Sequence, residues 1–318
     1  MLKVENLRTY FISRYKPPLK AVDGVSYELR QGETVAVAGE SGCGKSMSIL
    51  SLIRLNPPNS TIMGGEVWWG GQDLLQISAK ELYRIRGAEI AMVFQNPLSS
   101  LNPLMTIGDQ LSEAFQIHQG LGRKDSREES RRMLRQVALP DVKSKMDAYP
   151  FQLSGGMRQR VMIAMALCCA PKLLIADEPT TALDATTQAQ ILELIASANR
   201  EAGRATILVT HDLGIVARYA DRVHIMYAGR IVESAECVAL YSKPLHPYTE
   251  LLLKAVPRLD RSEDYRLVPI QGYPPRMDRL GPGCSYEPRC HRRVARCIEQ
   301  APLLEGASSG RAVACWQV

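Results

Sequence analysis

A glycine-rich octapeptide, GESGCGKS at residues 39–46, limits the possible folds of this chain more than any other stretch. Its first glycine ends a short apolar run, TVAVAG (34–39), and its last two residues begin KSMSILSLIRL (45–55), which has helical spacing. The octapeptide fits the pattern G-x-x-x-x-G-K-[ST] in the strand–loop–helix setting that this pattern requires. Its glycines let successive backbone N–H groups surround phosphate oxygens, and the following helix adds its positive dipole end. The motif predicts an α/β fold of the phosphate-binding-loop (P-loop) NTPase class.

The positions of this loop have separate expected roles toward a nucleoside triphosphate and Mg²⁺. Lys45 supplies a cation to the β and γ phosphates, and Ser46 supplies a hydroxyl oxygen to the metal ion. Cys43 contributes through its backbone, and its thiol is incidental. The residues expected to contact the nucleotide are Gly39, Glu40, Ser41, Gly42, Cys43, Gly44, Lys45 and Ser46.

Two adjacent carboxylates provide a second part of such a site. The apolar run LLIADE (173–178) reads as a buried strand that ends in Asp177 and Glu178. We expect Asp177 to hold Mg²⁺ directly or through water, and Glu178 to polarise the attacking water. Adjacent carboxylates at a strand end can also form an ordinary surface turn, but the intact phosphate loop favours the catalytic interpretation.

The rest of the chain alternates between an α/β pattern and a helical segment. GEVWWGGQDL (65–74) predicts a hairpin with its turn at two glycines, and ATILVTHD (205–212) predicts another buried strand. Helical periodicity dominates at about 97–160, which we interpret as a helical subdomain inserted into the α/β core. Proline and glycine become frequent after residue 235. We therefore expect a nucleotide-binding domain over 1–235 and a C-terminal extension over 236–318.

Composition and charge exclude several classes of function. The longest apolar run, VMIAMALCCA (161–170), is about half the length of a membrane span, and the start of the chain lacks the apolar run of a signal peptide. The net charge of +6 over 318 residues is too mild to predict a nucleic-acid partner. We expect a cytosolic protein whose membrane role, if any, comes through a partner.

The stretch LSGGMRQR (153–160), shortly before the paired carboxylates, makes the chain resemble an ABC-transporter ATPase subunit. The family pattern is usually LSGGQ, and Met157 here takes the fifth position. The resemblance implies that Ser154, Gly155, Gly156 and Met157 close on the γ-phosphate of ATP held by an opposite subunit. Two ATP molecules would then be sandwiched in a head-to-tail dimer.

Two further residues match catalytic positions of that family. Gln95 in VFQNP resembles the Q-loop glutamine, which reaches Mg²⁺ and the attacking water. His211 in VTHD resembles the switch histidine near the γ-phosphate. A lone histidine at a strand end could simply fill space, but the ordered set of motifs favours the catalytic role. The resemblance therefore implies Glu178, His211 and Gln95 as catalytic residues.

The remaining family positions concern the adenine, the dimer interface and the membrane partner. Phe11 aligns with the aromatic residue that stacks on adenine, although Tyr10 beside it competes for this role. Asp184 in TALD is similar to the D-loop residue that crosses the dimer interface. The segment NPLSSLNPLMTIGDQL (96–111) resembles the surface that receives a coupling helix from a membrane subunit.

The end of the chain resembles one branch of this family. HPYTELLLKAVPRLD (246–260) and the cysteines after it are similar to the ATPase subunits of dipeptide and oligopeptide importers. The resemblance implies ATP-driven import of peptides, or alternatively of glutathione, nickel complexes or opines. The implied partners are a second homologous ATPase subunit, two membrane-spanning permease subunits and an extracytoplasmic substrate-binding protein, without nucleic acid. The implied location is peripheral, at the cytoplasmic face of the cell membrane.

Two other functions compete with this interpretation. One is a soluble ABC ATPase acting on nucleic acid or ribosomes, although such proteins usually carry two cassettes in one chain. The other is a redox-sensing metal module for which the ATPase serves as a scaffold, an idea that the C-terminal cysteines motivate.

Four cysteines near the C-terminus have the spacing C-x5-C-x6-C-x17-C. Four thiolates suit either tetrahedral zinc or an iron–sulfur cube, and the spacing alone leaves both open. The resemblance implies a 4Fe–4S cluster, with Zn²⁺ as the alternative, in a small C-terminal metal-cluster extension. The arginines between these cysteines, Arg289 among them, could tune the cluster or contact a partner subunit, but we interpret them as a solvated basic face. The expected ligands are Cys284, Cys290, Cys297 and Cys315.

Overall fold

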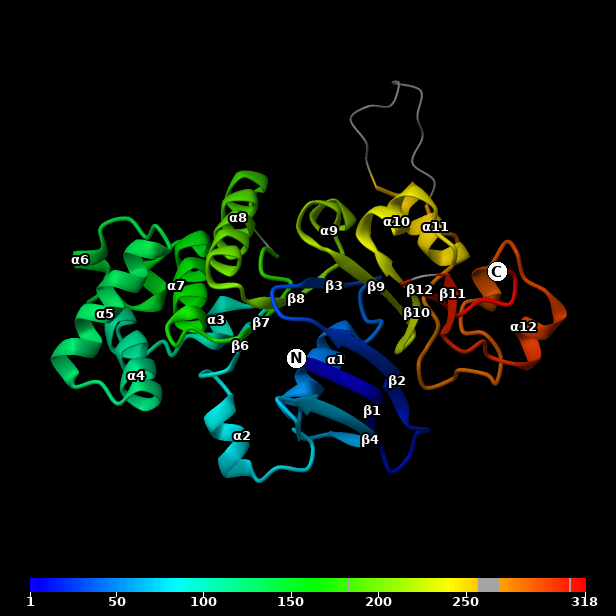
Figure 1. The fold of residues 1–318 in the computed structure, drawn as a ribbon, viewed down its shortest axis with the longest axis horizontal. Helices are drawn as coiled ribbons and strands as arrows, with labels where there is room; N and C mark the ends of the chain where they lie inside the picture. Colours follow the sequence, from blue (N-terminus) through cyan, green and yellow to red (C-terminus); the bar gives the residue numbers. More distant parts are fainter. Residues whose placement is uncertain (182, 257–268, 309) are drawn as a thin grey trace, which may run out of the picture. The chain divides into compact units, whose positions relative to one another are not determined.

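The computed structural model describes residues 1–181, 183–256, 269–308 and 310–318, and the chain forms two compact units (Figure 1). Residue 182 of the TALD motif and the end of the tail motif, 257–260, lie outside the described residues. The first unit comprises Met1–Arg30, Thr34–Gln76 and Val209–Val318, and the second comprises Gln31–Glu33 and Ile77–Leu208.

An antiparallel sheet forms one part of the first unit. Alternating apolar residues of its first strand are buried, as expected for a sheet with one covered face. Gly70 and Gly71 form the predicted hairpin turn with φ of 56° and 86°. The strand order is β2-β1-β4-β5, with β1 (Leu2–Phe11), β2 (Leu19–Leu29), β4 (Ser60–Trp69) and β5 (Gln72–Asp73).

A second sheet of this unit carries the glycine-rich loop. The predicted strand TVAVA forms β3 (Thr34–Ala38), which pairs in parallel with β9 (Arg222–Tyr227). The antiparallel strand β10 (Arg230–Glu236) follows β9, and the end of the chain adds β12 (Arg311–Val313) and β11 (Glu305–Ser308). Because β10 runs through residue 235 and pairs with β12, the division of the chain at that residue stays a prediction.

Short helices accompany this second sheet. The helix after the loop, α1 (Lys45–Leu52), ends three residues earlier than the spacing predicts, because Arg54 takes a left-handed φ of 53°. The structure also has α9 (Leu213–Tyr219), α10 (Cys237–Ser242), α11 (Pro247–Lys254), the 3₁₀ turn η2 (Glu287–Arg289) and α12 (Ala295–Glu299).

The second unit combines a parallel sheet with a group of helices. Strand β6 (Ile90–Val93) pairs in parallel with β7 (Leu173–Asp177), which is the predicted strand LLIAD, and β8 (Ala205–Thr210) follows β7. Parallel strands connected through helices give the predicted α/β class. The helices are α2 (Ala79–Ile85), α3 (Pro97–Ser100), α4 (Ile107–Gln119), α5 (Arg123–Gln136), α6 (Val142–Lys145), η1 (Pro150–Gln152), α7 (Gly155–Leu167) and α8 (Ala185–Ala202).

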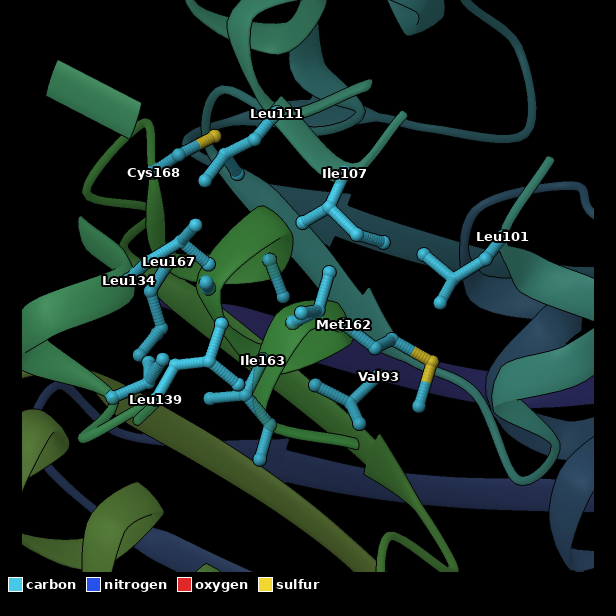
Figure 2. Close-up of a cluster of buried hydrophobic side chains, with 14 of the residues drawn as sticks. Val93, Leu101, Ile107, Leu111, Leu134, Leu139, Met162, Ile163, Leu167 and Cys168 are labelled. Carbon is cyan, nitrogen blue, oxygen red and sulfur yellow. The ribbon is translucent and has the colours of Figure 1, made fainter. Parts of the chain in front are cut away.

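Helices α4, α5, α7 and α8 of this unit share one apolar core (Figure 2). Leu111 of α4, Leu134 of α5 and Ile163 of α7 are all fully buried, and Val93 of β6 packs into the same cluster. The helical run predicted over about 97–160 continues to Leu167, because the last turn of α7 still buries apolar residues. No helix in the described parts of the chain has the length and hydropathy needed to cross a membrane.

Candidate functional site

The glycine-rich loop connects β3 to α1 and is tightly enclosed by backbone. Gly39 and Gly44 have φ of 152° and 105°, a region that favours glycine. A Cβ on Gly44 would lie 2.0 Å from the carbonyl oxygen of Ala21, and one on Gly39 would lie 2.3 Å from that of Met226. Any other residue at these two positions would collide with the neighbouring strands, so the loop conformation depends on glycine.

The lysine of the loop is held at its centre. Lys45 is only 4% exposed, and its Nζ donates to the carbonyl oxygens of Gly39 and Glu40 at 2.9 and 3.0 Å. Burial raises the pKa of the Cys43 thiol, so this thiol is neutral at ordinary pH, in line with the incidental role expected for it. A fixed ammonium in a loop with a helix start suits the phosphates of a nucleotide, so the donor set fits ATP.

Two residues that the sequence did not point to hold Glu40 of this loop. The backbone N–H of Glu40 donates to the Tyr248 hydroxyl at 2.9 Å. Its carboxylate accepts two hydrogen bonds from the Arg289 guanidinium, at 2.7 and 3.0 Å. The expectation of a solvated basic face is wrong for Arg289, whose side chain is 5% exposed, whereas Arg293 is 65% exposed. No local pattern relates residues 208 and 249 positions apart, so sequence reasoning missed both contacts.

The two aromatic candidates for adenine stacking differ in their surroundings. The Tyr10 hydroxyl donates to Asp23 at 2.6 Å, and Asp23 also accepts from Arg230. Burial and this carboxylate raise the pKa of Tyr10 to about 12. Phe11, at the end of β1, instead lines a cavity of about 440 Å³ that Met277 also borders. The hydroxyl of Tyr10 is thus engaged within the chain, whereas Phe11 borders a cavity, and the assignment of Phe11 to adenine stays a prediction.

The predicted switch histidine lies in the first unit. His211 is exposed and directly follows β8. The next residue, Asp212, caps α9 by accepting from the backbone N–H groups of Gly214 and Ile215. The histidine is thus fixed at the carboxyl end of a strand, where α/β proteins commonly bind ligands.

Three predicted residues come together in the second unit. Strands β6 and β7 are parallel neighbours, so Gln95 and Glu178 leave the sheet at the same edge. The Gln95 side-chain amide donates to Glu178 Oε2 at 2.9 Å, and the Thr181 hydroxyl donates to the same oxygen at 3.1 Å. Asp177, the last residue of β7, is 5% exposed. Thr181 is a contact that the sequence motifs did not single out.

The backbone of Glu178 is held in an unusual conformation. Its φ of 42° is left-handed, which costs a non-glycine residue about 1–3 kcal/mol. The Thr181 N–H donates to the Glu178 carbonyl at 3.2 Å, so the turn after β7 supports this conformation. These contacts orient the Glu178 carboxylate toward Gln95 despite the cost of the left-handed backbone.

The LSGG segment forms the start of a long helix. Ser154 caps α7 and accepts from the Met157 N–H at 3.4 Å, while Gly155 and Gly156 form the first turn. Ser154 and Gly155 are exposed, so the start of this helix lies at the surface of the second unit. A helix start of this kind attracts anions.

The D-loop aspartate lies beside the LSGG turn. Asp184 caps α8, accepting from the Thr187 N–H at 2.9 Å and from the Thr187 hydroxyl at 2.7 Å. These donors hold the pKa of Asp184 below its usual range. A Cβ on Gly156 would lie 2.9 Å from the methyl group of Thr187, so glycine permits this close packing. The predicted nucleotide residues therefore form two sets, one in each unit.

The four C-terminal cysteines are free thiols in the first unit. Among the described residues, no group of three or more His, Cys, Asp or Glu side chains is arranged to hold a metal ion. The backbone N–H of Cys284 donates to the carbonyl of Cys297 at 2.8 Å, which brings these two residues together. Burial and, to a smaller extent, the thiols of Cys297, Cys290 and Cys315 raise the pKa of Cys284 to about 11.

Backbone N–H groups support three of these sulfurs in a regular way. Burial raises the pKa of each of these thiols, and the N–H two residues further along the chain opposes that shift. The pairs are Cys284 with Tyr286, Cys290 with Arg292, and Cys315 with Gln317.

Comparisons with known proteins agree with the motifs. A family model described as ABC transporter matches residues 22–181, and one described as oligopeptide/dipeptide transporter, C-terminal region, matches residues 232–297. The chain is 47% identical to the dipeptide transport ATP-binding protein DppD of Bacillus subtilis, covering 99% of this chain and 94% of that protein. It is 46% identical to the oligopeptide transport ATP-binding protein OppD of Salmonella typhimurium, covering 100% and 93%.

One solved structure has a fold similar to that of this chain. It is the dimeric structure of a post-hydrolysis state of the ATP-binding cassette MJ0796 bound to ADP and Pi. The TM-score is 0.67 at 28% identity, over 74% of this chain and 99% of that chain. This similarity confirms the predicted P-loop NTPase fold, and the full-length relatives confirm the predicted resemblance. The chain belongs to the ATP-binding subunits of ABC transporters, in the branch that carries the oligopeptide/dipeptide transporter C-terminal region.

Proposed function

We propose that this chain binds and hydrolyses ATP to drive import of peptides through two permease subunits. The observation that carries the catalytic part is the pairing of Gln95 with Glu178 at the edge of the sheet next to Asp177. The names of the full-length relatives, which are dipeptide and oligopeptide transport proteins, support peptides as the cargo.

The proposed hydrolysis uses the residues of both sets. The phosphate loop, with Lys45, binds the triphosphate, and Phe11 stacks on the adenine. Glu178 takes a proton from water while the water oxygen bonds to the γ-phosphorus. The bond to the ADP oxygen then breaks, and His211 orients the γ-phosphate. Mg²⁺, when bound by Ser46, Gln95 and Asp177, neutralises charge on the phosphates.

A second, homologous ATPase subunit completes the site. The LSGG helix start of Ser154, Gly155, Gly156 and Met157 binds the γ-phosphate of ATP held by the partner, next to Asp184. The exposed start of α7 supports this role, since helix N-termini favour anions. The expected assembly is a heterodimer with two ATP molecules at its interface.

An exposed apolar surface supports the permease contact. Leu98, Leu104 and Phe151 are 59%, 85% and 67% exposed. The side chain of Gln110 holds the loop before α4 through three hydrogen bonds. It accepts from the Asn102 N–H at 2.9 Å and donates to the carbonyls of Asn102 and Met105, both at 3.0 Å. A rigid loop with exposed leucines suits a coupling helix, which would locate the chain at the cytoplasmic face of the membrane. An extracytoplasmic binding protein would supply the cargo.

The extension over 236–318 is proposed to hold a 4Fe–4S cluster on Cys284, Cys290, Cys297 and Cys315, with Zn²⁺ as the alternative. The neighbouring thiols and their backbone N–H donors support a metal-binding set, although the thiols are not arranged in a coordination shell. The bound metal would serve to fold a segment rich in proline and glycine. Brown, iron-containing protein supports the cluster, whereas colourless protein with one zinc supports the alternative.

Uptake measurements test the transport function. A strain with Lys45→Ala should lose peptide uptake, and its purified subunit should lose ATP binding, because the loop cation is gone. Uptake of glutathione, nickel complexes or opines in place of peptides would select the other cargo. ATP hydrolysis that follows the redox state of the cysteines would support a metal sensor, and hydrolysis stimulated by ribosomes would support a soluble ABC ATPase.

A further inference from the structure

The C-terminal extension contacts the phosphate loop at Glu40. Arg289 reaches the Glu40 carboxylate from η2, and Tyr248 reaches its backbone N–H from α11. Arg289 directly precedes Cys290 in the chain. The Arg289 side chain therefore connects the loop to the cysteine segment within one structural unit.

The contact between Arg289 and Glu40 restricts the position of both side chains. Arg289 donates through two nitrogens to both oxygens of Glu40, a planar arrangement that fixes distance and orientation. It also donates to the carbonyl of Gln271 at 3.0 Å and to the Tyr227 hydroxyl at 3.3 Å. With both partners largely buried, loss of one leaves the other charge without compensation.

Packed tyrosines connect the same cysteine segment to the sheet. Tyr286, two residues after Cys284, packs edge-on against Tyr227 with ring centres 5.2 Å apart, and lies 5.3 Å from Tyr248. Tyr227 and Tyr248 are themselves 4.7 Å apart. A shift of the cysteine segment would therefore move both the arginine and the tyrosine that hold Glu40.

Glu40 in turn sets the position of the catalytic lysine. Its carbonyl oxygen accepts from Lys45 Nζ at 3.0 Å and from the Cys43 N–H at 3.4 Å. A tilt of the Glu40 peptide would displace the lysine and the amide groups that face the phosphates.

We propose that Arg289 and Tyr248 are positioning residues for the phosphate loop, and that through them the cysteine-bearing extension controls the affinity for ATP. This inference rests on the proposed function, because it takes the loop to be the ATP site. Coupling between two sites is reciprocal, so ATP must also stabilise the extension.

A matched pair of tyrosine variants of the full chain tests the positioning. Tyr248→Phe removes the acceptor of the Glu40 N–H and keeps the ring. Tyr286→Phe is the control, because among the described residues its buried hydroxyl has no hydrogen-bond partner. With a fluorescent ATP analogue, we expect Tyr248→Phe to weaken binding at least about fivefold, within the usual range of coupling between sites, and Tyr286→Phe to leave it unchanged.

A second pair addresses the arginine. Arg289→Gln should weaken nucleotide binding at least about fivefold, Arg289→Lys should recover part of the loss, and Arg293→Gln should retain parental affinity. Hydrogen exchange of the amides at 284–290 should slow when ATP binds the parental chain, and not in Arg289→Gln. A merely structural arginine would change thermal stability but not this response to ATP.

The possible outcomes separate this inference from the proposed function. If Lys45→Ala abolishes ATP binding while folded Tyr248→Phe and Arg289→Gln bind ATP within twofold of the parental chain, the positioning role is overturned and the ATP site stands. If Lys45→Ala binds ATP normally, the loop is not the ATP site, and both proposals fail.

Discussion

The side-chain amide of Gln95 donates a hydrogen bond of 2.9 Å to Oε2 of Glu178. The two residues are 83 positions apart, yet they meet because β6 and β7 are parallel neighbours that end at the same edge. Thr181 adds a second donor to the same oxygen. Two donors hold the carboxylate in one orientation, which a general base requires before it can take a proton from a positioned water.

Replacing this carboxylate by an amide should separate ATP binding from hydrolysis. Glu178→Gln keeps the size of the side chain but removes the base, so phosphate release should fall by about 10²–10⁴-fold while ATP affinity is retained. Phosphate release and nucleotide titration on the same preparation measure both quantities. Turnover close to the parental rate would remove Glu178 from the role of base.

A charge placed opposite Glu178 should shift the pH profile of hydrolysis. Gln95→Glu replaces the amide donor by a second carboxylate 2.9 Å away, and like charges raise the pKa of the pair. Because the base must be ionised, the acidic limb of the pH–rate profile should move to higher pH. The neutral variant Gln95→Ala lowers the rate without that upward shift. An unshifted acidic limb in Gln95→Glu would mean that the two side chains are not in contact during hydrolysis.

Replacing Ser154 of the LSGG segment should prevent association with the partner subunit and leave ATP binding intact. Ser154→Ala removes a helix cap, at a cost of about 1 kcal/mol, as well as a hydroxyl of the proposed interface. ATP-dependent dimer formation with the partner subunit should be lost, while a single chain binds ATP as before. Sedimentation with and without ATP measures the association.

Thr106→Ala provides the matched control for this serine. Thr106 caps α4 in the same unit, and its hydroxyl accepts from the Asp109 N–H at 3.2 Å. This variant loses a cap of the same kind and should still dimerise. If both variants lost association equally, Ser154 would act only as a helix cap and not as an interface residue.

Local sequence patterns predict the parts of this fold that depend on nearby residues. The strands at 34–38 and 173–177 and the hairpin turn at Gly70–Gly71 are found as predicted, because each follows from periodicity and a few adjacent residues. The early end of α1 was missed, since it depends on the backbone of Arg54.

Long-range contacts could not be predicted in the same way. The sequence leaves Tyr10 and Phe11 open as the adenine contact, and no local pattern predicts the hydrogen bond from Tyr10 to Asp23. The contact between Arg289 and Glu40 has no local signal, because the same arginine-rich stretch also contains exposed residues such as Arg293. Which arginine turns inward is decided by packing of the folded chain.

A buried histidine should make the fold sensitive to acid. His224 of β9 is 2% exposed and lies against Tyr27, with ring centres 5.1 Å apart, and neither ring nitrogen has a hydrogen-bond partner among the described residues. Burial, with a smaller contribution from Arg222, lowers its pKa to about 3. The unfolded chain, with a histidine pKa of about 6.5, therefore binds a proton that the folded chain does not, and stability falls as the pH drops below about 6.5.

The size of this loss of stability follows from the same difference in pKa between the folded and unfolded chain. Between pH 7 and pH 5, His224 should remove about 2 kcal/mol from the free energy of unfolding. His224→Leu, which cannot take up a proton, should show a decrease smaller by about this amount in urea unfolding at the two pH values. Tyr27→Phe changes the same contact without altering a group that titrates in this range, so it should keep the parental dependence. If His224→Leu lost as much stability at pH 5 as the parental chain, other groups would carry the acid sensitivity, His246 first among them, because burial lowers its pKa to about 4.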